Sequence, residues 1–110
     1  MVVFQEISVQ EVAKLQETQQ KKPLPLIDVR EPDEYAQVRA RGSRNLPLSL
    51  LDTSSAAGQG LPQDEALYLM CRSGKRSARA CEIFAVAGYT RLFNVEGGML
   101  AWEAEGLPLG

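Results

Sequence analysis

The sequence of 110 residues contains no histidine and only two cysteines. Structural zinc sites usually need four Cys or His ligands and catalytic sites three, so this composition argues against a structural zinc site. The missing imidazole also removes Ser-His-Asp and Cys-His catalysis. Two cysteines are too few for a disulfide framework. Any cysteine nucleophile in this chain must therefore be activated without a histidine.

The chain also lacks long apolar runs and a strong excess of either charge. No run approaches the ~20 residues of a membrane span, and the start, MVVFQEISV, has no basic region followed by a long apolar core. The net charge of -2 argues against general nucleic-acid binding. We therefore expect a cytoplasmic protein without membrane or nucleic-acid partners, folded as one domain over residues 1–110.

Short apolar runs alternate along the chain with patterns that are typical of helices. The expected strands cover residues 3–6, 24–30, 66–70 and 90–95, and a short strand followed by a turn or short helix is expected within 44–51. The expected helices cover 9–17, 31–38, 77–88 and 97–106, with polar loops at 18–23 and 52–64. This alternation predicts an α/β fold, with a mostly parallel sheet of five strands covered by helices on both faces.

Cys71 directly follows the apolar run LYLM and opens the segment CRSGKRS. In open α/β sheets, sites form beyond the carboxyl ends of strands. The segment combines the small residues Ser73, Gly74 and Ser77 with the cations Arg72, Lys75 and Arg76. Small residues let the backbone curl, so that N–H groups before a helix point inward and bind an anion. This environment favours a thiolate, and predicts a cysteine nucleophile facing a small oxyanion.

Each of these features also has a structural interpretation. Cys71 could be a small buried hydrophobe at a strand end, but its position, the small residues and the cations together favour a functional role. Cys81 lies within the apolar spacing of the following helix, so we expect it to pack in the core rather than to act as a resolving thiol. A second group of cations is expected to form a solvated face. This group consists of Arg39, Arg41 and Arg44.

Four segments, spread over most of the chain, resemble segments of the single-domain rhodanese family, whose members are thiosulfate sulfurtransferase-like proteins. They are LIDVREPDEY, NLPL, YLMCRSGKRS and NVEGGMLAWEAEGLPL, in that order. The resemblance implies the three-layer rhodanese-like fold. The segment VRARGSRNLP departs from the family pattern, since Arg39 stands where the family usually has a histidine and only Gly42 is kept. We expect different packing near the third strand there, and the extra arginines could form a docking face.

The spacing of the active-site loop separates neighbouring families. Four residues lie between Cys71 and Arg76. In the length of this loop, six residues from Cys71 to Arg76, the chain resembles rhodaneses. The related cell-cycle phosphatases and the tyrosine phosphatases carry one more residue between the cysteine and the arginine, which makes room for phosphate. The shorter loop suits attack on sulfur. A small pocket is also consistent with arsenate-type oxyanions, so a small phosphatase or arsenate reductase remains a weaker alternative.

The resemblance also implies roles for individual residues. The persulfide-bearing nucleophile would be Cys71, and the loop amides that cradle it would be those of Arg72, Ser73, Gly74, Lys75, Arg76 and Ser77. The side chains of Arg72, Lys75 and Arg76 would steer an anion. Residues with structural roles would be Asp28 and Arg30 as an ion pair, Trp102 in the core, and Gly97 and Gly98 in the turn before the last helix.

The function implied is a sulfurtransferase. It would move a sulfane sulfur from thiosulfate or a similar anion to cyanide, a small thiol or a protein thiol, through a persulfide on Cys71. No metal or organic cofactor is implied. The alternative within the same family is a sulfur-relay or protein-docking module with weak turnover of free thiosulfate.

Overall fold

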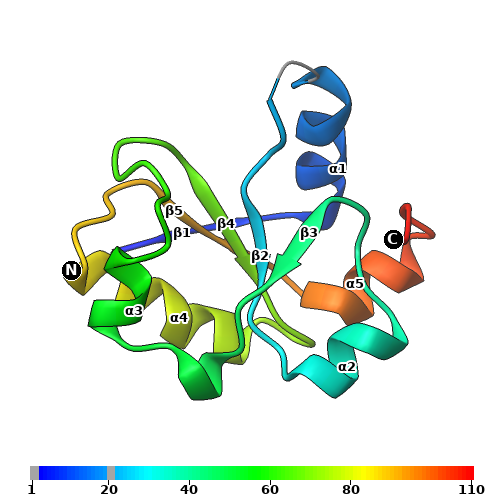
Figure 1. The fold of residues 1–110 in the computed structure, drawn as a ribbon. Helices are drawn as coiled ribbons and strands as arrows, with labels where there is room; N and C mark the ends of the chain where they lie inside the picture. Colours follow the sequence, from blue (N-terminus) through cyan, green and yellow to red (C-terminus); the bar gives the residue numbers. More distant parts are fainter. Residues whose placement is uncertain (1–2, 20–21) are drawn as a thin grey trace.

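The computed structural model describes residues 3–19 and 22–110. Within these residues, five parallel strands form the central sheet, in the order β1-β5-β4-β2-β3 (Figure 1). The strands are β1 (Gln5–Ile7), β2 (Leu26–Asp28), β3 (Ser43–Asn45), β4 (Leu67–Met70) and β5 (Leu92–Val95). The helices are α1 (Val9–Thr18), α2 (Pro32–Gln37), α3 (Thr53–Ala57), α4 (Lys75–Val86) and α5 (Gly98–Ala104), with a short 3-10 turn, η1 (Leu48–Leu50). The expected α/β fold with a parallel sheet is confirmed.

Helices cover both faces of this sheet. Figure 1 shows α1 and α5 on one side of the strands and α3 and α4 on the other. The central strand β4 explains this arrangement, because side chains alternate along a strand. Leu67 and Leu69 pack toward α4, where they meet Phe84, whereas Tyr68 and Met70 pack with Trp102 of α5. All four residues of β4 are buried, as its unbroken apolar run requires.

The first helix begins where its capping pattern places it. The Ser8 hydroxyl accepts a hydrogen bond from the amide of Glu11 at 3.1 Å, and α1 follows directly. The strand before it runs over Gln5–Ile7, later than the expected 3–6, because Ile7 still pairs in register with Val95. In the polar loop expected at 18–23, Thr18 belongs to α1, and Gln20 and Lys21 lie outside the described residues.

The prediction of a loop over residues 52–64 is wrong in part, because α3 occupies the beginning of this segment. Asp52 accepts a hydrogen bond from the amide of Ser55 at 2.8 Å, and the Ser55 hydroxyl accepts one from the amide of Asp52 at 2.8 Å. This reciprocal cap starts the helix. Ala56 is fully buried against the core and anchors it. The small and polar composition, which reads as a loop, hides a short helix that tertiary packing stabilises.

The fourth helix begins at Lys75, two residues before the expected start at 77. Gly74 takes a left-handed conformation with φ 103° immediately before it, and this conformation ends the loop early. Lys75 and Arg76 therefore belong to the first turn of α4 rather than to a loop. The helix ends as expected before Gly88, which has φ 107°.

The arginine-containing segment before β3 pairs with the C-terminal segment. Ala40 forms an antiparallel bridge with Leu109, and Arg39 lies over the Tyr35 ring at 5.3 Å from its centroid. Arg41 and Arg44 are exposed, as expected for a solvated face, whereas Arg39 is half-buried and also donates to the Tyr35 carbonyl at 3.3 Å. Among the helices of residues 3–19 and 22–110, none combines the length and the apolar character that crossing a bilayer requires.

Candidate active site

Cys71 lies at the carboxyl end of β4, in the middle of the sheet and between β5 and β2. The neighbouring strands β2 and β5 run parallel to β4, so their carboxyl ends open on the same edge. Cys71 is 1% exposed, and residues 72–74 bend directly after it. This is the position that the sequence predicts for the cysteine.

The turn after Cys71 directs backbone N–H groups back toward the sulfur. The amide of Gly74 donates to the Sγ atom of Cys71 at 3.0 Å. The left-handed conformation of Gly74, with φ 103°, is one that residues with a Cβ rarely adopt. The Ser77 hydroxyl, from the first turn of α4, lies 3.5 Å from the same sulfur. These groups form a ring of donors around Sγ.

The ring changes the ionisation of Cys71. Burial alone would raise the pKa of this thiol, because it disfavours the charged form. Hydrogen bonds from the Ser77 hydroxyl and from the amides of Ser77, Gly74 and Ser73 lower the pKa of Cys71, and together they outweigh burial. Three of the six predicted loop amides therefore act on the sulfur. The thiolate is stabilised without an imidazole.

The three predicted cations of the loop divide into two kinds. The side chains of Arg72 and Lys75 are exposed. The guanidinium of Arg76 instead makes a bidentate ion pair with Glu34 of α2, with distances of 2.7 and 2.9 Å. This hydrogen-bonded pair holds the pKa of the Glu34 carboxyl at about 2, below its ordinary 4.5. Arg76 thus ties the active-site turn to α2.

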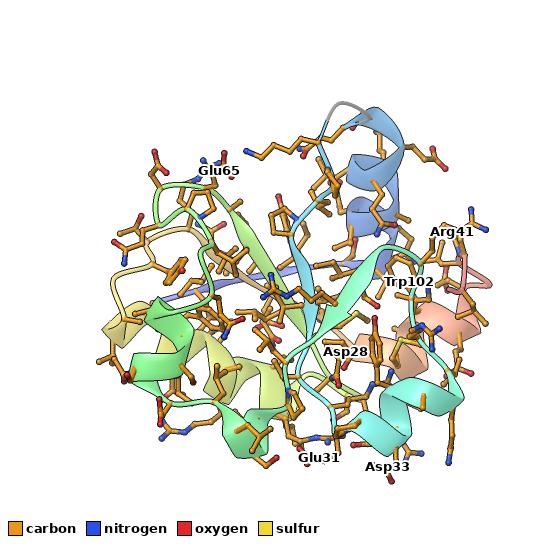
Figure 2. All side chains as sticks on the ribbon, in the orientation of Figure 1. Asp28, Glu31, Asp33, Arg41, Glu65 and Trp102 are labelled. Carbon is orange, nitrogen blue, oxygen red and sulfur yellow. The ribbon has the colours of Figure 1, made fainter. Side chains whose placement is uncertain are left out.

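Asp28 and Arg30 form the ion pair that the sequence predicts at the end of β2. Arg30 donates from Nη2 to Asp28 at 2.8 Å and to the Val38 carbonyl at 2.6 Å, and from Nη1 to the Glu34 carbonyl at 3.3 Å. Asp28 is fully buried and Arg30 is 4% exposed. Figure 2 shows Asp28 inside the molecule, whereas Asp33 lies at its periphery on α2. The pair supports the segment between β2 and α2.

The start of α5 packs directly on the backbone of Cys71. The amide of Met99 donates to the Cys71 carbonyl at 2.8 Å, and that of Leu100 to the Arg72 carbonyl at 3.1 Å. A Cβ atom on Gly98 would lie 2.2 Å from the Cys71 oxygen, so only glycine fits there. The sequence predicts a turn at Gly97 and Gly98, but not this contact. The Gly97-Gly98 pair is the one sequence feature that could have indicated a close approach of two backbone segments.

Two further residues near the site escape the sequence analysis. Asn94 of β5 is 3% exposed, and its side-chain nitrogen donates to the Gly74 carbonyl at 3.0 Å and to the Glu6 carboxylate of β1 at 3.0 Å. Its side-chain oxygen accepts a hydrogen bond from the Ser77 hydroxyl. Asn94 opens the segment NVEGGMLAWEAEGLPL, but no local pattern places its side chain or that of Glu6 near the loop, because the order of the strands brings them there.

Cys81 and Trp102 lie in the core, as predicted. Cys81 is fully buried on α4, and burial, with smaller effects of Glu6 and Glu82, raises the pKa of its thiol to about 12. Trp102 is fully buried and donates from Nε1 to the Pro108 carbonyl at 2.9 Å (Figure 2). Within the described part of the chain, no cluster of three or more His, Cys, Asp or Glu side chains could hold a metal ion.

Curated proteins similar to this chain include named sulfurtransferases. A protein from Allochromatium vinosum described as a sulfurtransferase is 37% identical over 84 residues, which are 76% of each chain. The chain is also 36% identical over 87 residues to the probable adenylyltransferase/sulfurtransferase MoeZ of Mycobacterium tuberculosis, of which it spans 22%. The putative sulfur carrier protein YrkF of Bacillus subtilis is 30% identical over 82 residues, covering 74% of this chain and 43% of YrkF.

Solved structures share the fold. A rhodanese-like domain protein from Staphylococcus aureus superposes with a TM-score of 0.73 at 28% identity, covering 90% of this chain and 91% of its own. The polysulfide-sulfur transferase of Wolinella succinogenes superposes with a TM-score of 0.75 at 28% identity, covering 97% of this chain and 78% of its own. The family model described as the rhodanese-like domain matches residues 8–105. The protein therefore belongs to the rhodanese-like domain family, and its relatives include a protein named as a sulfurtransferase.

Proposed function

We propose that the protein is a sulfurtransferase that carries a sulfane sulfur as a persulfide on Cys71. The observation that supports this most directly is the 3.0 Å hydrogen bond from the Gly74 amide to the sulfur, within a ring that lowers the pKa of Cys71. A thiolate is the reactive form of cysteine. Sulfurtransferase relatives that match most of the chain support the same chemistry.

In the first half-reaction, the outer sulfur of thiosulfate is transferred to Cys71. The Cys71 thiolate attacks the outer sulfur of thiosulfate, a new S–S bond forms, and the old S–S bond breaks. Sulfite leaves with the electron pair of that bond. The negative charge then lies on the outer sulfur of the persulfide, within reach of the N–H groups of the ring, which stabilise it electrostatically. The exposed cations Arg72 and Lys75 would attract the incoming dianion.

The second half-reaction returns the enzyme to its starting state. A thiophilic acceptor, such as cyanide or a thiolate, attacks the outer sulfur and leaves with it. The Cys71 thiolate is released as the leaving group, so that two substrates react in turn at one sulfur and the kinetics are ping-pong. The chain's own thiol and amides carry both steps.

A sulfur-relay module is the second candidate, and a groove beside the loop favours it. This groove has a volume of about 390 Å³ and lies between α2 and α5. Its lining includes Arg72, Met99, Leu100 and Glu103. The backbone amide of Met99 donates a hydrogen bond to the Cys71 carbonyl. A protein acceptor could dock there and extend a thiol toward Cys71. A relative named as a putative sulfur carrier is consistent with this use.

A phosphatase or arsenate reductase has less support. An arginine guanidinium can hold two oxygens of a phosphate at once, and Arg76 is the arginine at the end of the loop. Its guanidinium is already occupied by both carboxylate oxygens of Glu34. Binding phosphate through Arg76 would first require this pair to break.

Mass spectrometry and a turnover assay together test the proposal. The protein is incubated with thiosulfate, and its mass is measured for one added sulfur on the peptide that contains Cys71. Transfer to cyanide is then compared among the unchanged protein, Cys71→Ser and Cys81→Ser. We expect the adduct and turnover to vanish only in Cys71→Ser.

The outcomes separate the candidates. An adduct with negligible transfer to cyanide would favour the relay, and transfer to a protein thiol would then be measured. No adduct with thiosulfate or with a polysulfide would overturn the proposal. Phosphate release from an aryl phosphate, lost in Cys71→Ser, would favour the phosphatase instead.

A further inference from the structure

The hydroxyl of Ser77 carries one proton, but two acceptors lie within its reach. Its oxygen lies 2.5 Å from the side-chain oxygen of Asn94 and 3.5 Å from the sulfur of Cys71. Ser77 is fully buried on the first turn of α4. A single hydroxyl proton cannot be donated to both acceptors at once. Where this proton points therefore depends on Asn94 and on the charge of the sulfur.

The side chain of Asn94 has only one possible orientation. Its nitrogen lies 3.0 Å from the Gly74 carbonyl and 3.0 and 3.3 Å from the two carboxylate oxygens of Glu6. These groups accept hydrogen bonds and cannot donate them, so the amide nitrogen must face them and the amide oxygen must face Ser77. The charged carboxylate polarises the amide, which makes its oxygen a stronger acceptor.

The thiol and the thiolate forms of Cys71 require different hydrogen bonds from the Ser77 hydroxyl. A Cys71 thiol can donate its own proton to the Ser77 oxygen while Ser77 donates to Asn94, so that every group is paired. A Cys71 thiolate has no proton and needs donors. Ser77 can serve the thiolate only by turning its proton away from Asn94, which leaves the buried Asn94 oxygen without its donor. An unpaired buried acceptor is costly.

We propose that Glu6 and Asn94 are positioning residues that compete with the sulfur of Cys71 for the proton of the Ser77 hydroxyl, and so restrain ionisation of the nucleophile. This restraint has a chemical benefit. Thiolates become weaker nucleophiles as their basicity falls, and the hydrogen bonds from the amides of the ring already favour ionisation. A competing acceptor keeps the thiolate more basic than the ring alone would.

The same competition follows the sulfur through the proposed reaction. When a sulfane sulfur joins Cys71, the negative charge moves to the outer sulfur, and Sγ becomes a neutral bridging atom. The Ser77 proton can then return to Asn94, and the amides of the ring remain free to hold the outer sulfur. The hydroxyl is thus a donor that serves Sγ only while Sγ is charged. This inference rests on the proposed role of Cys71.

Other charged groups surround the sulfur but do not enter this chain of hydrogen bonds. Arg76 of α4 is paired with Glu34 of α2, and Asp28 is paired with Arg30 after β2. None of the variants compared below changes a residue of these two pairs. Cys81 does not interfere with a titration of Cys71, because its own pKa is raised to about 12.

The test is a double-mutant cycle on Ser77 and Asn94 that measures ionisation of Cys71. Thiolate absorption and the rate of alkylation are followed against pH for the unchanged protein, Ser77→Ala, Asn94→Leu and the double variant. Below the titration midpoint, we expect Ser77→Ala to slow alkylation about tenfold, since a donor to a charged group is lost. Asn94→Leu should speed alkylation about threefold, because the hydroxyl proton is released to the sulfur.

The double variant decides the mechanism. If Asn94 acts through the Ser77 proton, Asn94→Leu should have no accelerating effect once Ser77→Ala has removed that proton. Slower alkylation in Asn94→Leu, or an equal change with and without the Ser77 hydroxyl, would overturn the proposal.

A second route covers the case in which Asn94→Leu does not fold. Glu6 is exposed, so Glu6→Gln should fold, and a neutral amide polarises Asn94 less than a carboxylate does. We expect faster alkylation of Cys71 in Glu6→Gln, and no such change in the Ser77→Ala background. A change that persists in that background would show a direct effect of the charge and would contradict the proposal. The matched control is Glu11→Gln, another exposed carboxylate.

These measurements distinguish the inference from the proposed function. They record ionisation of Cys71 and require no sulfur donor. A failed cycle would leave persulfide formation on Cys71 unaffected, and absence of a persulfide would leave the measured competition for the Ser77 proton intact.

Discussion

Arg76 and Glu34, 42 positions apart in the sequence, form a bidentate ion pair with distances of 2.7 and 2.9 Å. Arg76 lies on the first turn of α4, which follows the active-site turn, and Glu34 lies on α2. The pair joins the two segments that follow β4 and β2, which border the site. The sequence suggests that Arg76 attracts an incoming anion, but in the structure its guanidinium binds the carboxylate of Glu34 instead.

The Arg76–Glu34 pair should make stability depend on pH in the acid range. The folded protein holds the pKa of Glu34 at about 2, below its ordinary 4.5. Because the folded pKa is depressed, the stabilisation is complete above about pH 4.5 and is lost as the pH falls through about 2. Both side chains are partly exposed, so screening limits the effect of Glu34→Gln to about 1 kcal/mol.

Denaturant unfolding across this pH range checks the prediction. The free energy of unfolding of Glu34→Gln should fall below that of the unchanged protein at neutral pH, and the two should converge near pH 2. Glu103→Gln, an exposed carboxylate on α5, is the control and should change stability little at any pH. A difference for Glu34→Gln that stays constant down to the lowest pH would contradict the ion-pair explanation.

Gly98→Ala should damage the site more than it damages the fold. Its Cβ atom would lie 2.2 Å from the Cys71 carbonyl oxygen and 2.7 Å from that of Arg72, so the loop or α5 must move. We expect a loss of stability of about 1–3 kcal/mol from overpacking and a loss of sulfur transfer of at least about tenfold from the displaced ring.

The control for this variant is Gly106→Ala. Gly106 also has a positive φ, 66°, but a Cβ atom there would meet nothing within 4 Å. It should lose stability through its backbone conformation and keep its rate of sulfur transfer. Equal loss of activity in both variants would show that general destabilisation, rather than the contact of α5 with Cys71, explains the effect.

Asp28→Ala should be strongly destabilising, because it leaves the Arg30 guanidinium buried without its carboxylate. Asp28 is fully buried and Arg30 is 4% exposed. Removing one partner of a buried ion pair costs about 3–5 kcal/mol. Thermal or denaturant unfolding measures this cost, and Asp33→Ala, on the exposed side of α2, is the control. A loss below about 1 kcal/mol would contradict a mainly structural role.

The sequence predicts the parts of the fold that depend on neighbouring residues. The apolar run before Cys71 identifies a buried strand, and the small residues after it identify the turn, because both signals are local. The same reasoning misses α3, whose cap at Asp52 and Ser55 is present in the sequence but whose stability depends on burial of Ala56. Short helices of this kind depend on packing that no local pattern reveals.

The candidate site shows the same division between local and distant contacts. Cys71, Gly74 and Ser77 belong to one segment and can be predicted together. Asn94 and Glu6 reach that segment only because β5 lies between β4 and β1 in the sheet. An asparagine in an apolar strand indicates an unusual environment, but the sequence does not reveal which polar groups meet it. Strand order is therefore the information that the sequence analysis lacks.

The two cysteines should differ sharply in reactivity toward an alkylating reagent in the folded protein. Ring donors lower the pKa of Cys71, whereas burial raises that of Cys81 to about 12. Alkylation at Cys71 should rise with pH and level off below the pH at which an ordinary thiol ionises. Cys81 should stay unmodified throughout the neutral range and react only after unfolding, because neither charge nor exposure assists it.

Peptide mapping by mass spectrometry after brief alkylation measures both sites in one sample. Cys81→Ser should leave the rate at Cys71 unchanged, and a denatured sample should show both cysteines modified at similar rates. Rapid modification of Cys81 in the folded protein would mean that α4 opens readily and that its thiol can approach solvent. A disulfide between the two cysteines after mild oxidation would contradict the assignment of Cys81 to core packing, since such a bond requires both sulfurs to meet.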